Sequence, residues 1–165
     1  MTSPVRTTLD LARTRPLAEA VALVDRFAAA GLVDLAAARA AAAHLSGRDC
    51  RVVREVLGLA DGLAGSPQET RVRLLIADSS LPQPVAQFTV RDHGRFVARV
   101  DFAWPQQQLA LEYDGLWHAE PGQFAVDRQR LNRLLAAGWR VLFITAADLH
   151  RPGALLQRIA SALAA

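Results

Sequence analysis

The sequence contains no lysine. All 19 of its basic residues are arginine, and 16 acidic residues leave a formal net charge of only +3 at pH 7. A GC-rich coding sequence favours alanine and arginine, and this bias alone would explain why every basic residue is arginine. The alternative is phosphate binding, because the guanidinium group holds phosphate oxygens through two parallel hydrogen bonds. Charge alone does not separate the two explanations.

Cysteine and long apolar runs are also scarce. The single cysteine, Cys50, excludes an intrachain disulfide framework and a cysteine-based zinc site. No apolar run is both long enough and free enough of charge to span a bilayer. The first residues, MTSPVRTTLDLART, lack the apolar region of a secretory signal. We therefore expect a cytoplasmic protein with no membrane partner. Its 165 residues, 52% of them hydrophobic, suffice for one domain with a small appendage.

Residues 1–65 have the apolar spacing of helices throughout. The pattern predicts helices over 16–30, over 35–45 after an Asp34 cap, and over 51–63, with a short leading helix over 7–13. No residue type in this segment indicates catalysis. We expect a helical N-terminal segment, whose helices offer a surface for a second copy of the chain or for a partner protein.

The character of the sequence changes at residue 66. Ser66-Pro67-Gln68-Glu69 is a helix start with a capping box, and it opens a helix that extends to 79. The patterns that follow indicate strands over 85–91 and 96–114, a helix over 124–137, a buried strand over 140–145 and a helix over 152–163. The order α-β-β-β-α-β-α predicts an α/β (α+β) domain with a mixed central sheet over residues 66–165.

Two acidic residues stand inside the strands predicted over 96–114. If residues 105–108 form a four-residue loop, Asp101 lies opposite Glu112, and Arg99 lies opposite Asp114. Opposed carboxylates about 5 Å apart repel each other, and burial strengthens the repulsion. One acid is then protonated, or arginines neutralise the pair, or a cation binds between them. Hard oxygen ligands at this spacing suit Mg²⁺ or Mn²⁺.

Four segments of this region carry a resemblance: SPQET (66–70), RVDFAWP (99–105), LALEYDGLWH (109–118) and DRQRLNRLLAAGWRVLFIT (127–145). In order and spacing they resemble the very-short-patch-repair endonuclease-like domains, common in actinobacterial proteins, of the restriction-endonuclease-like PD-(D/E)XK superfamily. The resemblance implies a restriction-endonuclease-like αβββαβ core. It also implies an endonuclease of repair or defence type that hydrolyses phosphodiester bonds in DNA with Mg²⁺ (or Mn²⁺).

The resemblance also implies roles for individual residues. Asp101 and Glu112 would bind the metal together with the backbone carbonyl of Tyr113. Glu69 would bind or orient a metal-bound water, and His118 falls where these nucleases carry a histidine near the scissile phosphate. Glu69, Asp101, Glu112 and His118 are thus the predicted catalytic residues. Around them we expect DNA contacts from Arg71, Arg128, Arg130 and Trp117, and supporting roles for Arg99, Asp114 and Asp127.

The sequence departs from the superfamily at position 114, where Asp114 replaces the motif lysine. An arginine can stabilise charge on the phosphate, but it does not give up its proton in proteins. The base would then be His118, a carboxylate or a metal-activated water. The departure keeps an alternative function open, a catalytically inactive nucleic-acid-binding module in a toxin–antitoxin or defence system.

Most of these residues also have a purely structural interpretation. Glu69 occupies the N3 position of a capping box, and Asp127 could be the N-cap of its helix. Asp114 could be a turn residue paired with Arg99, and His118 could be a hydrogen-bonded surface residue. The solvated face of a helix would account for Arg128, Arg130 and Arg133. The Asp101–Glu112 pair has no comparable structural explanation, so the functional prediction depends most heavily on it.

Overall fold

The structure is a computed structural model that describes residues 2–115 and 123–165, apart from the side chains of residues 123 and 124. The chain divides into two compact units, Met1–Leu74 and Leu75–Ala165, and the division falls inside helix α5 (Pro67–Ala77). The boundary predicted from sequence, between residues 65 and 66, precedes this division because the first turns of α5 are bonded to the first unit. None of the described helices is long and apolar enough to cross a membrane.

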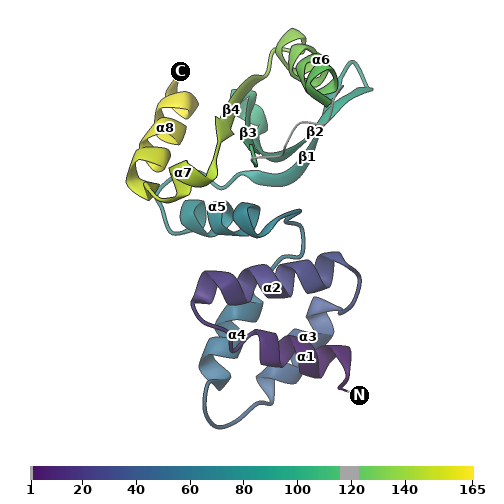
Figure 1. Cartoon of the computed structure of the whole chain (residues 1–165), viewed down its shortest axis with the longest axis vertical. Helices are drawn as coiled ribbons and strands as arrows, with labels where there is room; N and C mark the ends of the chain where they lie inside the picture. Colours follow the sequence, from purple (N-terminus) through teal and green to yellow (C-terminus); the bar gives the residue numbers. More distant parts are fainter. Residues whose placement is uncertain (1, 116–122) are drawn as a thin grey trace. The chain divides into compact units, whose positions relative to one another are not determined.

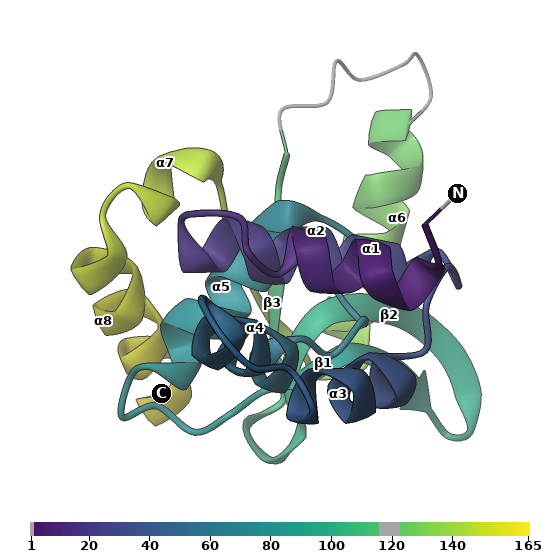
Figure 2. The same ribbon diagram turned by 90° about the horizontal axis from the view of Figure 1, so that it is seen from below.

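The first unit is helical, as predicted. Its helices are α1 (Pro4–Leu11), α2 (Leu17–Ala29), α3 (Leu35–Ala43) and α4 (Cys50–Leu59). Helix α1 packs against α2 and α3, and α4 packs against α2 and α3 (Figures 1 and 2). Buried aliphatic residues from all four helices, among them Leu9, Val21, Val24, Ala38, Val53, Val56 and Leu57, form its core. The predicted cap is confirmed, because Asp34 accepts a hydrogen bond from the backbone N–H of Ala36 at 2.9 Å.

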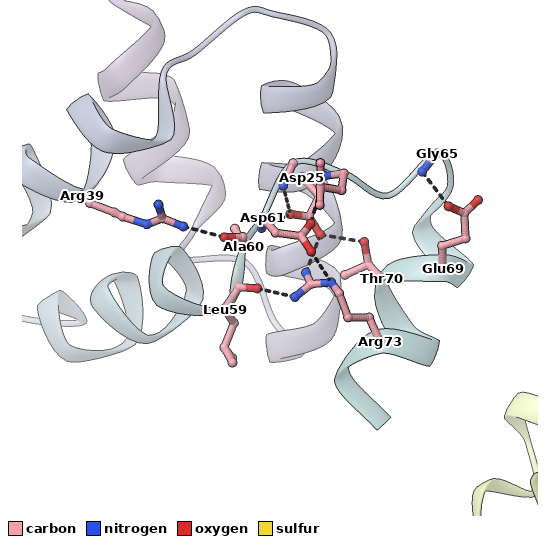
Figure 3. A network of polar contacts seen from close by, with 11 residues as sticks. Asp25, Arg39, Leu59, Ala60, Asp61, Gly65, Glu69, Thr70 and Arg73 are labelled. Carbon is pink, nitrogen blue, oxygen red and sulfur yellow. Dashed lines mark hydrogen bonds and ion pairs between the residues drawn. The ribbon is translucent and has the colours of Figure 1, made fainter. Parts of the chain in front are cut away.

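Helix α4 ends at Leu59, four residues short of the prediction, because the next backbone N–H groups have another acceptor. Asp25 of α2 is fully buried, and its Oδ1 accepts hydrogen bonds from the N–H groups of Asp61 and Gly62, each at 2.9 Å. Its Oδ2 accepts from the Thr70 hydroxyl (2.8 Å) and from Arg73 (2.9 Å), both on α5. One carboxylate thus connects α2, the segment after α4 and the start of α5 (Figure 3).

The second unit contains a four-stranded mixed sheet, in agreement with the predicted fold class. The strands β1 (Val85–Asp92), β2 (Arg95–Trp104), β3 (Leu109–Tyr113) and β4 (Arg140–Ile144) lie in the order β1-β2-β3-β4 (Figure 1). The first three are antiparallel, and β4 is parallel to β3. Its helices are α6 (Gln123–Ala136), α7 (Ala146–Leu149) and α8 (Pro152–Ala164). Helix α7 was not predicted, and the loop after β2 contains a 3₁₀ turn, Pro105–Gln107.

Helix α6 covers the face of the sheet that carries the candidate site. It packs against β2 and β4. Leu134 is buried in one cluster with Ala103 of β2 and Ala110 of β3, which pair with each other. Two alanines in facing positions leave room for the helix to approach the sheet closely. Arg130 precedes Leu134 by one helical turn, so its side chain lies over the same face, nearer to Asp101 of β2 and to Glu112 close to the end of β3.

Candidate functional site

The predicted hairpin register is confirmed. Phe102 pairs with Leu111, Ala103 with Ala110 and Trp104 with Leu109. Asp101 and Glu112 are therefore the next residues beyond the paired region. There the main-chain ladder is replaced, because the N–H of Tyr113 donates to Asp101 Oδ2 at 2.8 Å. The Asp101 carboxylate thus occupies the place of a main-chain carbonyl, and this bond fixes it at the end of β3.

Gln87 approaches Asp101 from the opposite side. The β1–β2 pairs Ala86↔Phe102 and Phe88↔Val100 place Gln87 level with Asp101. Its φ of +51° is in the left-handed region, where residues other than glycine are uncommon and where strain tends to accompany a functional constraint. The Gln87 side chain hydrogen-bonds the Asp101 carboxylate. Asp101 is consequently held by groups from both neighbouring strands.

Glu112 is bound by an arginine from α6. Its side chain is only 10% exposed, and both carboxylate oxygens accept from Arg130 Nη2, at 2.6 and 2.8 Å. The same nitrogen donates to the backbone carbonyl of Arg99 at 2.6 Å. Of the three arrangements open for opposed acids, the structure contains neutralisation by an arginine, and Arg130 supplies it.

Burial dominates the protonation of both acids. It raises the pKa of Asp101 above its usual value, although the N–H of Tyr113 and the charges of Arg130 and Arg99 act in the opposite direction. The pKa of Glu112 is raised to about 7, chiefly by burial and to a smaller extent by the nearby charges of Asp101 and Asp127. The hydrogen bonds and charge of Arg130 lower the Glu112 pKa, but they do not outweigh the loss of solvation.

The structural interpretation of Glu69 is confirmed in part. Ser66 Oγ accepts from the N–H of Glu69 at 3.2 Å, as a cap of α5 should. The buried Glu69 carboxylate accepts from the N–H of Gly65 at 2.7 Å, one residue before the serine that a capping box would use. Glu69 belongs to the first unit, and its role in metal binding stays a prediction.

The other predicted residues have varied surroundings. Asp114 is exposed, and its N–H donates to the carbonyl of Ile144 at 2.7 Å. Arg99 and Asp114 lie beyond the paired residues of β2 and β3, and their predicted pairing stays a prediction. Arg71 forms an exposed ion pair with Glu19 at 2.9 Å. Asp127 and Arg128 are exposed on α6, and Trp117 and His118 lie outside the described residues.

Two residues of the site differ from the sequence interpretation. Arg130 was predicted to contact DNA or to belong to a solvated face, but in the structure it binds Glu112. Its position one turn before the buried Leu134 was a usable signal for this. Gln87 was not predicted at all. Nothing in the alternation of β1 distinguishes it, because its importance comes from its left-handed backbone and from its position level with Asp101.

The donor set fits a hard divalent cation. Asp101 and Glu112 offer carboxylate oxygens, and the Tyr113 carbonyl offers a third oxygen of the kind that Mg²⁺ and Mn²⁺ prefer. Mg²⁺ is commonly bound by one or two carboxylates, with water completing the shell. Among residues 2–115 and 123–165, no group of three or more His, Cys, Asp or Glu side chains is arranged to hold a metal. Such a site would therefore depend on two carboxylates.

Comparison with known proteins gives relatives but no assigned activity. The chain is 37% identical over 166 aligned residues to two uncharacterized proteins of Mycobacterium tuberculosis, MT2308 of strain CDC 1551 / Oshkosh and Rv2248 of strain ATCC 25618 / H37Rv. The alignment covers 96% of this chain and 60% of each relative, so the chain spans about three-fifths of their length. No family model matches the sequence. No solved structure matches it either.

Proposed function

We propose that the second unit is a Mg²⁺- or Mn²⁺-dependent nuclease domain that hydrolyses phosphodiester bonds in DNA. The observation that carries this proposal is the pair of desolvated acids, Asp101 and Glu112, on neighbouring strands. Holding a buried and a partly buried carboxylate close together is unfavourable for folding, and such perturbed acids concentrate at functional sites. The resemblance in four sequence segments to very-short-patch-repair endonuclease-like domains supports the same class of activity.

Each residue of the pair has a defined part in this proposal. Asp101 and Glu112 would hold the cation, and the Tyr113 N–H and Gln87 would keep the Asp101 carboxylate in position. The bound metal ion would stabilise charge on the reacting phosphate and activate a water molecule. His118 is the proposed group for orienting that water or accepting its proton, and the role of Glu69, which belongs to the first unit, stays a prediction from the resemblance. Arg128 and Trp117 are the proposed DNA contacts of this unit, and a DNA contact by Arg71 of the first unit stays a prediction from the resemblance.

A cleavage assay on plasmid, mismatched and branched DNA with Mg²⁺ or Mn²⁺ tests the proposal. We expect Asp101→Ala and Glu112→Ala to abolish cleavage and to leave DNA affinity largely intact. Asp101→Asn is the matched control for folding, because its amide oxygen still accepts the Tyr113 N–H. It should remain folded yet lose cleavage. Cleavage that survives all three substitutions would refute this assignment of the active site.

A second candidate function is DNA binding without cleavage. Two observations favour it: Asp114 stands at the position of the motif lysine, and Arg130 already neutralises Glu112, so the pair can exist without a metal. Under this alternative the Asp101 and Glu112 variants would bind DNA like the wild type, and none of the proteins would cleave it with any divalent cation. Arg128→Ala should then weaken binding and reduce its salt dependence by about one unit of slope for each phosphate group that the variant no longer binds.

A further inference from the structure

Arg130 binds Glu112 through a single nitrogen atom. Nη2 donates to both carboxylate oxygens of Glu112 and to the carbonyl of Arg99, at 2.6 to 2.8 Å. These are short, charge-assisted hydrogen bonds in a largely buried place. Both oxygens that Glu112 could offer to a cation are therefore engaged by the guanidinium group.

This contact disfavours a metal ion on the same carboxylate, because Arg130 Nη2 occupies the position from which a cation would bind both oxygens. A Mg²⁺ ion bound to either oxygen lies about 2.1 Å from it, while Arg130 Nη2 lies 2.6 and 2.8 Å from the two oxygens. Two cations would then face each other across one carboxylate in a place where burial weakens screening. This repulsion favours withdrawal of the guanidinium group when a metal ion binds Glu112.

Arg130 is suited to withdraw. Its side chain is 31% exposed, against 10% for Glu112, and the hydrogen bonds that it makes with described residues all come from Nη2. A long arginine side chain can move its head toward water while its stem stays packed. A divalent ion would also replace one positive charge with two beside Asp101 and Glu112, so the acids remain neutralised after Arg130 leaves.

We propose that Arg130 is a displaceable counter-ion. It holds Glu112 while the site lacks a metal, leaves the carboxylate when a divalent cation binds, and then binds a phosphate group of the DNA backbone. The last step rests on the proposed nuclease function. Position 114 carries Asp114 and supplies no cation, so Arg130 would bring the positive charge from α6 instead. It would stabilise phosphate charge without acting as a base, because arginine stays protonated.

Arginine side-chain NMR of the full chain during a titration with Mg²⁺ alone tests the displacement. Without Mg²⁺ we expect slow rotation and shifted Nη signals for Arg130, because its nitrogen is hydrogen-bonded. With Mg²⁺ these features should disappear, while the signals of exposed Arg133, one turn further along α6, stay unchanged. If Mg²⁺ shifts the backbone signals of Asp101 and Glu112 but not those of Arg130, the counter-ion proposal fails and the nuclease proposal stands. If Mg²⁺ affects none of these residues, both proposals fail.

DNA affinity measured with Ca²⁺ and with EDTA tests the second step. Arg130→Gln should weaken DNA binding about tenfold with Ca²⁺ and less than twofold with EDTA, because Arg130 reaches phosphate only after a cation frees it. Arg130→Lys keeps the charge and should lose less. Arg133→Gln removes the same charge from the same helix and should have equal effects in both conditions. Equal losses for Arg130→Gln in the two conditions, or no loss in either, would overturn the proposal.

Discussion

Glu112 makes the stability of the second unit depend on pH. Its pKa is about 7 in the folded chain, and the usual value for a glutamate, which applies to the unfolded chain, is 4.5. The folded chain therefore binds this proton more tightly than the unfolded chain does. Protonation therefore favours folding. The contribution of Glu112 to stability is complete below about pH 4.5 and is lost as the pH rises through about 7. Asp101, whose pKa is also raised, contributes with the same sign from a lower starting pH.

We expect the free energy of unfolding of the second unit, measured in urea, to differ between about pH 5 and about pH 8. The wild type should be less stable at the higher pH, and Glu112→Gln should reduce that difference, because it removes the group that must lose its proton. Glu55→Gln is the control, because Glu55 is exposed on α4 and should leave the difference unchanged. A Glu112→Gln protein with the full wild-type pH dependence would contradict the assignment.

The sequence predicts the positions of the two acids in the strands but not the residues that bind them. Alternation and loop length sufficed to predict the pairs from Phe102–Leu111 to Trp104–Leu109, after which Asp101 and Glu112 are the next residues, because register follows from the turn that joins two strands. The residues that bind the two acids, Gln87 and Arg130, cannot be predicted from alternation or loop length. Gln87 depends on a left-handed backbone conformation inside a strand, and Arg130 depends on how α6 packs against the sheet, which no local pattern specifies.

At the scale of single elements, Asp25 fixes where two helices end and begin. Its carboxylate accepts from the segment after α4 and from Thr70 and Arg73 on α5. Arg73 also donates to the carbonyl of Leu59 at 2.7 Å, and its Nε lies 3.0 Å from Asp61 Oδ2 in an ion pair without hydrogen-bond alignment. Removing Asp25 would leave a largely buried guanidinium group and three further donors without their acceptor.

Asp25→Ala should therefore destabilise the first unit by about 3–5 kcal/mol, the usual cost of breaking a buried ion pair from one side. Arg71→Ala, which removes the exposed ion pair between α5 and Glu19 of α2, should cost less than about 1 kcal/mol. Thermal unfolding followed by circular dichroism compares the two variants. Similar losses of stability would show that the Asp25 network contributes no more than a surface ion pair.

The ends of elements were the least predictable part of the fold. Apolar spacing sufficed to predict the helices and strands that bury a hydrophobic face, since burial is what makes such spacing stable. It gave no sign that α4 would end at Leu59, because the acceptor responsible, Asp25, lies far away in sequence. The short helix α7 escaped prediction for a related reason: four residues carry too little periodicity to recognise.

Because the chain folds as two compact units, we expect metal binding in the second unit to stabilise mainly that unit. Each unit has its own buried core. Mg²⁺ at a hundredfold excess over its dissociation constant should stabilise the protein that binds it by about 2.7 kcal/mol. We expect hydrogen exchange followed by mass spectrometry to show slower exchange in peptides from β2, β3 and α6, and unchanged exchange in peptides from α1 to α4.

Glu112→Ala is the control for that experiment and should show no response to Mg²⁺ in either unit. Peptides that cover Glu69 report separately on its predicted role. Slower exchange in α1 to α4 that persists in Glu112→Ala would mean that the ion binds elsewhere, and the assignment of the metal site to the second unit would be wrong.

The order of strands in the sheet has a consequence for how the second unit folds. Because β1, β2 and β3 are neighbours both in the chain and in the sheet, they can pair by closing short loops, whereas β4 can pair only after the chain has passed through α6. The three-stranded meander would thus form first, with Asp101 and Glu112 still hydrated. Their desolvation would come late, when α6 docks and brings Arg130 to Glu112. The free-energy cost of desolvating the two acids would then arise after the transition state for folding. Substitutions of these acids should therefore change the rate of unfolding more than the rate of folding.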